Sequence, residues 1–441
     1  MAKKILVCFL VTAFLLAFNP MVAEALPEDM PPKPDQLSII ALDIDVEQFG
    51  EGVEIFEEKY DIEVEWMEYP YGDLWDQITT SIAGGSTFDL YMMSRSWHAE
   101  LGQLGMAMPL DDVVSQDTLD AVNQKFFDST VEFVSSHGHQ WAIPGTAATV
   151  TFFYNERMLN EMGYEDPPDN WDEMLEMSRE AIDQDIAEYG FFPGWLSGHE
   201  DGMVWFDILL RLHDGRWMNE DRTEWVFNDE KGVETLEFMK SILDEGLIPE
   251  ASLEVSDWDN FHHFLSGDQL FEINWNFVFQ SARDPDRSEV VDEFGFGHIP
   301  GIERESYTLM GGGGYAISPT TRSPEWSFVL LDYMHREEGA LGVMEEQAGA
   351  EAVVKDVYEN YEDYGLTLDE HPMIEVFQEQ IEYASVEPYG RPSGYLTWYS
   401  EFRDNIFTPA MHRALLGEQD IQEALDEAQE EAQQMLEAEG L

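Results

Sequence analysis

Cysteine is almost absent from this chain of 441 residues, in which Cys8 is the single example. One cysteine cannot form an intrachain disulfide or supply the paired thiolates of a structural zinc site. Basic residues are the second shortage, with 22 Lys and Arg against 91 Asp and Glu and a formal net charge of −69. A surface this negative repels nucleic acid and anionic lipid, so neither is expected as a partner.

The acidity needs an explanation, because so many like charges repel one another in a folded chain. Molar salt shortens the Debye length to about 3 Å and removes most of that repulsion. We therefore interpret the charge as a halophilic surface. An acidic surface that binds cationic ligands is the alternative that the composition leaves open.

Long apolar runs are confined to the N-terminus. Lys3 and Lys4 precede the apolar segment 5–18, and Ala-Glu-Ala at 23–25 fits a cleavage site. The apolar segment is shorter than the roughly 20 residues of a spanning helix. We predict that residues 1–25 are a signal peptide that is removed, leaving a periplasmic or otherwise extracellular protein. A retained membrane anchor is the alternative.

The rest of the chain alternates between two hydrophobic periods. After a Pro-rich linker at 26–36, strand-like runs at 37–42, 62–66 and 88–93 are separated by helical spacings at 49–60 and 71–83. This order predicts an α/β fold with parallel strands and crossover helices. The length favours two domains.

Motifs for catalysis are missing. The chain has no G-x-S-x-G or H-E-x-x-H sequence, and the four glycines at 311–314 lack the Lys-Ser/Thr of a phosphate loop. The histidine pairs at 137/139 and 262/263 have no further ligand at a recognisable spacing, so no metal and no cofactor are expected. Paired carboxylates carry no weight in a chain with so many acids.

Aromatic residues in loops are the strongest sign of binding. Rings at strand ends suit flat ligands that stack on one face and hydrogen-bond at their edges, such as sugars. The candidates are Trp97, Trp195, Trp275 and Trp398, for each of which ordinary packing is the alternative. Trp66, Trp171 and Trp326 lie on periodic apolar stripes and are assigned to the core.

Several weak motifs follow one another in a familiar order. They are GGSTFDLYMM (84–93), LGQLGMAMPLDDVV (101–114), the segment 140–174 with its IPG and YNERM sequences, SGDQLFEINW (266–275), GGGGYAISP (311–319) and ALLGEQDIQEALDEAQ (414–429). In this order the chain resembles the family 1 extracellular solute-binding proteins of ABC importers, the sugar-type family that includes maltose-binding protein. The resemblance covers about 37–438.

That resemblance implies a two-lobed periplasmic-binding-protein fold of type II, with a ligand cleft between lobes joined by crossing hinge strands. Lobe one is expected at 37–145 plus about 308–360, and lobe two at 146–307 plus about 361–441. The lobes of this family close on a solute and deliver it to a membrane permease. The chain itself is expected to be a monomer.

Site residues carried over by position come from several segments. Those not yet named are Asp43, Asp45, Arg95, Asn276, Gly312, Gly313, Tyr315 and Arg391. The glycines would let bare N–H groups approach a ligand closely; a hinge that touches no ligand is the alternative. Thr146 and Ala148 stand where some sugar-binding relatives carry Tyr and Asp, which puts the sugar's identity in doubt.

The expected solute is a mono- to oligosaccharide or a polyol. A cationic or zwitterionic solute such as a betaine is the alternative, because aromatic cages hold quaternary amines. A secreted carbohydrate-active enzyme and a sensory ectodomain are two further alternatives.

The halophilic interpretation predicts a salt-dependent stability. Lowering the salt below roughly 0.1 M should lower the melting temperature, because the repulsion between surface carboxylates is then poorly screened. Thermal melts from molar to millimolar salt measure the effect. A melting temperature that does not change with salt would contradict the interpretation.

Overall fold

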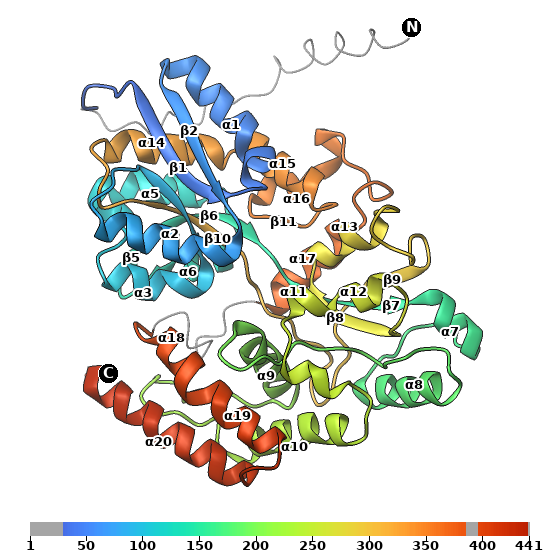
Figure 1. Cartoon of the computed structure of the whole chain (residues 1–441). Coiled ribbons are helices and arrows are strands. Elements are labelled where there is room, and N and C mark those ends of the chain that lie inside the picture. Colours follow the sequence, from blue (N-terminus) through green and yellow to red (C-terminus); the bar gives the residue numbers. More distant parts are fainter. Residues whose placement is uncertain (1–29, 385–395, 440–441) are drawn as a thin grey trace, which may run out of the picture.

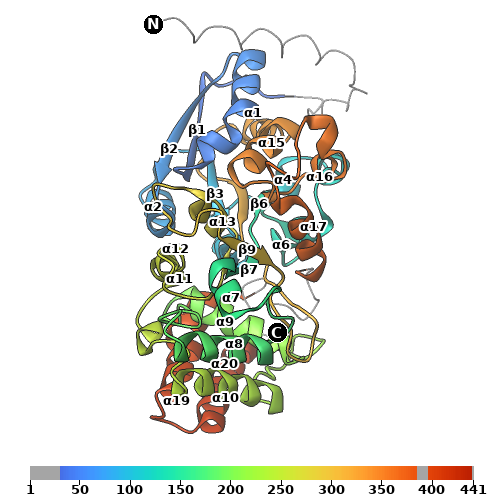
Figure 2. The same ribbon diagram turned by 90° about the vertical axis from the view of Figure 1, so that its right-hand side faces the viewer.

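Two halves stacked end to end make up the molecule (Figures 1 and 2). The computed structural model describes residues 30–384 and 396–439. The expected signal peptide and Arg391 lie outside these residues. Each half has its own sheet. One buried core includes Phe56 and Leu330 of the upper half and continues to Phe153 and Phe279 of the lower half, and a second core lies around Trp217 and Leu425.

The upper half is built on a six-stranded sheet with the order β11-β6-β10-β3-β1-β2. Its strands are β1 (Gln36–Leu42), β2 (Glu63–Tyr69), β3 (Leu90–Ser94), β6 (Ala142–Ala147), β10 (Gly313–Ile317) and β11 (Glu351–Ala352). Strand β1 pairs in parallel with β2 and β3, as the sequence predicts. Strand β10 runs antiparallel between β3 and β6, which the sequence pattern did not indicate.

Helices cover this sheet. The first two crossovers are the predicted helices, α1 (Asp45–Tyr60) and α2 (Tyr71–Ala83). Phe49, Val53 and Phe56 form the buried stripe of α1. The other helices of this half are α3 (His98–Gln103), α4 (Leu110–Val113), α5 (Gln116–Asn123), α6 (Asp128–Phe133), α14 (Pro324–Met334), α15 (Glu337–Glu346) and α16 (Lys355–Glu359).

The lower half contains a three-stranded antiparallel sheet with the order β8-β7-β9. Its strands are β7 (Val150–Asn155), β8 (Phe271–Trp275) and β9 (Phe294–Gly297). The helices of this half are α7 (Glu156–Met162), α8 (Trp171–Asp183), α9 (Glu200–Leu212), α10 (Glu230–Asp244), α11 (Asp257–Asn260), α12 (His262–Leu265), α13 (Phe277–Arg283), α18 (Tyr399–Glu401), α19 (Thr408–Leu415) and α20 (Ile421–Glu439). Helix α17 (Met373–Tyr383) lies near the junction of the halves.

The tryptophans assigned to the core behave nearly as expected. Trp171 and Trp326 are buried, at 2% and 8% exposed. Trp66 is only partly buried and packs against the first core from β2. Helix α8 is capped at its N-terminus, because the Asn170 side chain accepts a hydrogen bond from the Glu173 amide at 3.0 Å.

Two chain segments cross side by side between the halves. The segment from β6 to β7 passes through Thr149, and the returning segment passes through Met310 before β10 begins. The Val150 amide donates to the Leu309 carbonyl at 3.2 Å, and the Gly311 amide donates to the Ala148 carbonyl at 2.6 Å. The crossing is therefore a short antiparallel ladder.

The crossing explains why four consecutive glycines stand at this point of the chain. A Cβ on Gly311 would lie 2.4 Å from the Trp275 ring, and on Gly314 it would lie 2.3 Å from the Ile143 carbonyl oxygen. Gly313 is equally confined, and Gly312 adopts a φ of +83° that favours glycine. Side chains are excluded here because β10 enters between two close strands beneath a tryptophan ring.

The confinement of β10 predicts a costly substitution. Gly314→Ala should lower the free energy of unfolding by about 2 kcal/mol, within the range for overpacked sites, because its methyl group meets a backbone oxygen. Gly50→Ala in α1 is the matched control, since a Cβ there has nothing within 4 Å. The control should be neutral or stabilising by up to about 1 kcal/mol. Equal denaturation midpoints for the two variants would show that the crossing tolerates side chains.

Candidate binding site between the lobes

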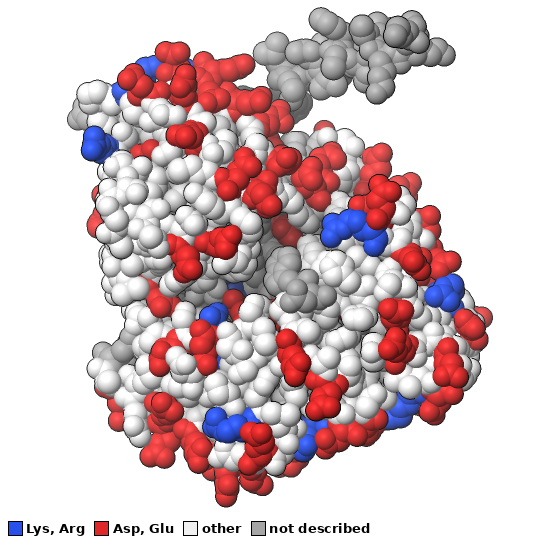
Figure 3. Space-filling model, viewed as in Figure 1, with Lys and Arg blue, Asp and Glu red and all other residues white. Residues whose placement is uncertain are grey.

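The loop after β3 meets the lower half of the molecule. The Ser96 hydroxyl donates to Glu200 Oε2 at 3.3 Å, at the start of α9. From the other side, the Ser400 hydroxyl in α18 donates to Glu100 Oε2 at 2.9 Å. On the face drawn in Figure 3, the surface is hollowed where the two halves meet. Polar side chains from both halves therefore reach across one junction.

Aromatic rings line the upper side of this junction. Trp97 stacks on Tyr71, with ring centroids 5.5 Å apart and an interplanar angle of 19°. Trp75 meets Trp97 edge-on at 5.4 Å. Trp97 is 8% exposed, whereas Tyr71 is 37% exposed. The outer ring of the stack is therefore the one available to a ligand.

Arg95 places a cation beside this stack. Burial lowers the pKa of the guanidinium, although the nearby carboxylates of Glu200 and Asp207 and the hydroxyl of Tyr399 favour its charged form. Its Nη2 is buried and has no hydrogen-bond partner among the described residues. A buried donor without a partner is costly, and a ligand oxygen would satisfy it.

The glycine segment holds this arginine in position. The Arg95 amide donates to the Gly312 carbonyl at 3.0 Å. Trp275, half-buried at the end of β8, covers Gly311 one residue earlier. Three of the predicted site segments thus converge on the crossing: the loop after β3, the end of β8 and the start of β10. Gly313 is packed against the Met93 carbonyl within β10.

A second group of predicted residues lies inside the upper half. Tyr315 is 1% exposed and donates its hydroxyl to Asp45, which also accepts from the Leu42 amide at 2.8 Å. The Tyr315 ring packs edge-on against Phe49 at 5.7 Å. Tyr315, carried over as a site residue, therefore lies in the core of the upper half and not at the junction. Asp43, next to this pair, is exposed.

The remaining predicted residues are dispersed. Trp195 is fully buried and packs against Trp205. Asn276 is buried and accepts a hydrogen bond from the Thr149 amide at 3.2 Å, so it fastens the crossing. Trp398 is half-buried and tilts against the buried ring of Trp225. A position in a loop, the feature used to select these tryptophans, does not by itself expose a ring.

Sequence reasoning missed Tyr71, Trp75, Glu200 and Tyr399. Tyr71 and Trp75 are spaced i, i+4 on α2, a pattern that also fits a buried helix stripe. Glu200 begins α9 but is one acid among many. Tyr399 follows a stretch whose pattern indicated only a loop. The pair of aromatic residues at the start of a crossover helix was the one usable signal.

Comparison with known proteins identifies the class. Residues 51–365, more than two thirds of the chain, match the family of bacterial extracellular solute-binding proteins. The chain therefore belongs to this family, and the predicted membership is confirmed.

Individual relatives are distant in sequence. The maltotriose-binding protein of Pyrococcus abyssi is 24% identical over 277 residues, which cover 61% of this chain and 55% of that protein. The match thus spans only about half the length of this curated relative. A maltose-bound protein of T. maritima has a TM-score of 0.75 at 20% identity, covering 91% of this chain and 99% of that one.

A solute-binding protein of Agrobacterium radiobacter K84 in complex with ribitol is equally similar in structure, with a TM-score of 0.75, 20% identity and coverage of 91% and 100%. These structural likenesses confirm the two-lobed α/β fold. Within residues 30–384 and 396–439, none of the helices combines the length and apolarity needed to cross a membrane.

Burial makes Asp45 a source of pH dependence. Desolvation raises its pKa from 3.8 to about 7, against the opposing hydrogen bond from Tyr315. The folded chain therefore binds this proton more tightly than the unfolded chain does. The associated stability is present below pH about 4 and is lost as the pH rises towards 7, by at most about 4 kcal/mol.

Asp45→Asn should remove this contribution. The unfolding free energy of the wild type, relative to that of the variant, should fall between pH 4 and 7 and stay level above. Denaturant titrations of both proteins at each pH, in molar salt, measure the difference. A difference that is constant with pH would mean that Asp45 keeps an ordinary pKa in the fold.

Proposed function

We propose that this chain is the exported solute-binding component of an ABC importer, that it binds a carbohydrate or polyol between its lobes, and that it delivers this solute to a membrane permease. We propose a monomer released by cleavage of a signal peptide at residues 1–25. The choice of solute rests on the Tyr71–Trp97 stack and on the neighbouring Arg95. The Nη2 atom of Arg95 has no hydrogen-bond partner among the described residues.

This pair of features matches the chemistry of sugars. A sugar or polyol has C–H groups that pack on a ring face and hydroxyl groups that both donate and accept hydrogen bonds. The exposed ring of Tyr71 suits the C–H groups. The Arg95 donor and the Glu200 carboxylate suit the hydroxyl groups. Hydrogen bonds to charged groups of this kind are shorter and stronger than neutral ones.

The relatives give independent support. Proteins with the same fold are named for maltotriose or were solved with maltose or ribitol. These relatives therefore favour a sugar or a polyol as the solute of this chain. The family is one of solute-binding proteins, and we propose binding without turnover.

A betaine is the second candidate. Its carboxylate would pair with Arg95 and its quaternary ammonium would lie on the Tyr71 ring. The same guanidinium that attracts the carboxylate repels the ammonium a few ångströms away. We therefore rank a neutral polyhydroxyl solute first.

Closure of the lobes would couple binding to recognition by the permease. The hydrogen bonds from Ser96 to Glu200 and from Ser400 to Glu100 join the two sides of the junction. A solute held by both sides adds to these bonds and shifts the population towards the closed form. We propose lobe one at 37–145 plus about 308–360, and lobe two at 146–307 plus about 361–441; the two separate sheets support the assignment of the strands. Helix α17, within the second range, packs against the upper half, where Phe377 stacks on Tyr358.

A thermal-shift screen in molar salt tests the proposal with mono- and disaccharides, polyols and betaines. A bound solute at 100 times its dissociation constant adds about 2.7 kcal/mol to the stability of the chain. We expect one group of sugars or polyols to raise the melting temperature, and to be recovered chemically intact. A shift with betaines alone would replace the first candidate by the second, and a hydrolysed sugar would indicate an enzyme.

Variants locate the site. Arg95→Ala should weaken binding of the responding solute at least about tenfold, because a charge-assisted hydrogen bond is lost. Arg322→Ala removes the same charge from an exposed loop position and is the matched control. Calorimetric affinities for both variants provide the comparison. Equal affinities would move the site away from Arg95.

A further inference from the structure

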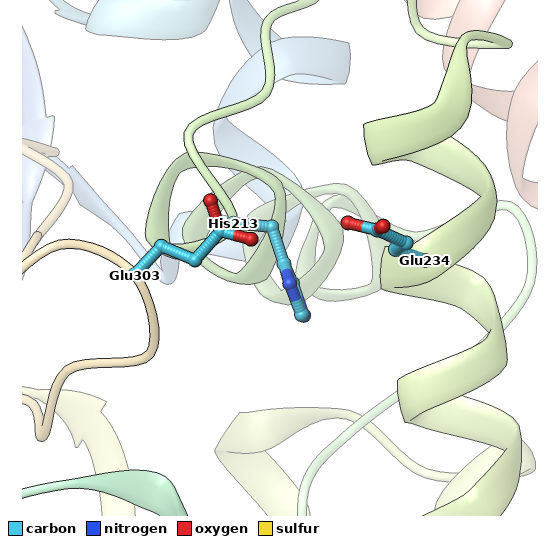
Figure 4. Close-up of side chains that lie close together, drawn as sticks. All are labelled: His213, Glu234 and Glu303. Carbon is cyan, nitrogen blue, oxygen red and sulfur yellow. The ribbon is translucent and has the colours of Figure 1, made fainter.

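A second cluster of polar side chains lies in the lower lobe. His213 caps the C-terminal end of α9, Glu234 belongs to α10, and Glu303 lies in the loop after β9. Each offers one ligand atom, and these atoms lie within 4.8 Å of one another. Figure 4 shows the two glutamates reaching towards one another, with the His213 ring between them.

The histidine points to a missing ligand. His213 is 9% exposed, and its Nε2 is buried without a hydrogen-bond partner among the described residues. Its ring contacts Phe238 edge-on at 5.5 Å, which fixes the ring but satisfies neither nitrogen. A buried imidazole nitrogen without a hydrogen-bond partner is unusual, because unmade bonds of buried polar groups are costly.

The backbone holds the three side chains in place. The amides of Glu303 and Arg304 both donate to the Leu212 carbonyl, at 2.9 and 3.2 Å. Arg304 also forms an ion pair with Asp214 at 2.8 Å. The loop is thus attached to the end of α9 on both sides of His213, so the donor atoms are brought together before any ligand arrives.

Lys231 occupies part of this cluster. Its ammonium lies 2.9 Å from Glu234 and 2.6 Å from Glu303. Its side chain is 31% exposed, so it can turn to solvent. Two carboxylates and one ammonium leave a charge of −1, whereas a divalent ion in place of the ammonium would leave the cluster neutral. In a chain of net charge −69, that exchange is favourable.

We propose that His213, Glu234 and Glu303 form a binding site for a divalent transition-metal ion of the zinc type, which displaces the ammonium of Lys231. One imidazole nitrogen and two carboxylate oxygens suit zinc, with solvent completing the coordination. Donor atoms on one zinc ion lie at most about 4.2 Å apart, so the three side chains draw slightly closer on binding. The bound ion would fasten α9, α10 and the loop after β9 to one another. The site is independent of the cleft and its solute.

Calorimetric titration of Zn²⁺ into the purified full chain tests the proposal, in molar salt of a weakly coordinating anion. The salt suppresses diffuse binding to surface carboxylates. We expect one Zn²⁺ per chain, a higher melting temperature with Zn²⁺ than with Ca²⁺, and affinity at least about tenfold lower in His213→Ala. His298→Ala is the matched control, because His298 also contacts a glutamate, Glu379 at 2.8 Å, outside the cluster. It should bind zinc like the wild type.

The outcomes separate clearly. Glu303→Gln is a second variant, and it retains the shape of the side chain. A site at this cluster requires that this variant also weakens zinc binding. Lys231→Met should bind zinc more tightly, since the competing cation is gone. Absence of stoichiometric zinc binding in the wild type, equal responses to Zn²⁺ and Ca²⁺, or unchanged affinity in both His213→Ala and Glu303→Gln would overturn the proposal.

Discussion

The passage of strand β10 between β3 and β6 is the constraint on which the rest of the structure depends. Backbone oxygens of Met93 and Ile143 lie where side chains of Gly313 and Gly314 would begin. The same segment pairs with the outgoing chain at Thr149 and supports Trp275 and Arg95. This one glycine segment therefore begins an interior strand of the upper sheet, joins the lobes and positions the binding loop. Its glycines serve close packing, and the ligand-facing groups are side chains held by that packing.

Charge acts on two scales in this protein. Across the surface, carboxylates outnumber basic groups and are spread over the face shown in Figure 3. This repulsion is diffuse, and salt weakens it. Inside the molecule, single ionisable groups such as Arg95 and Asp45 are surrounded by specific partners and are screened far less. Stability in salt and recognition of a solute are therefore separate properties of different residues.

Much of the fold follows from local patterns. The parallel strands β1, β2 and β3 and the helices between them were predictable because each has a clear period and short connections. The antiparallel entry of β10 was not, because it pairs residues more than 150 positions from β6 and depends on contacts that only the folded chain makes. The order of weak motifs, rather than any single one, predicted the family correctly.

The site was harder to predict for the same reason. Arg95 and Trp97 were found because they follow a strand end. Trp195 was selected from a loop and Tyr315 from the glycine motif, yet both lie within cores. Periodicity shows which residues belong to an element but not which face of a sheet or loop another element will cover. The partners Tyr71 and Glu200 come from separate helices, so only the fold brings them to Arg95.

Saturation-transfer NMR on a mixture of sugars, polyols and betaines in molar salt would test the central claim most directly, that a neutral polyhydroxyl solute stacks on the ring of Tyr71 beside Arg95. The account predicts strong transfer from the protein to the C–H protons of one sugar or polyol, with that signal lost in Tyr71→Ala. Transfer confined to the methyl groups of a betaine, or a sugar signal that persists in Tyr71→Ala, would contradict it.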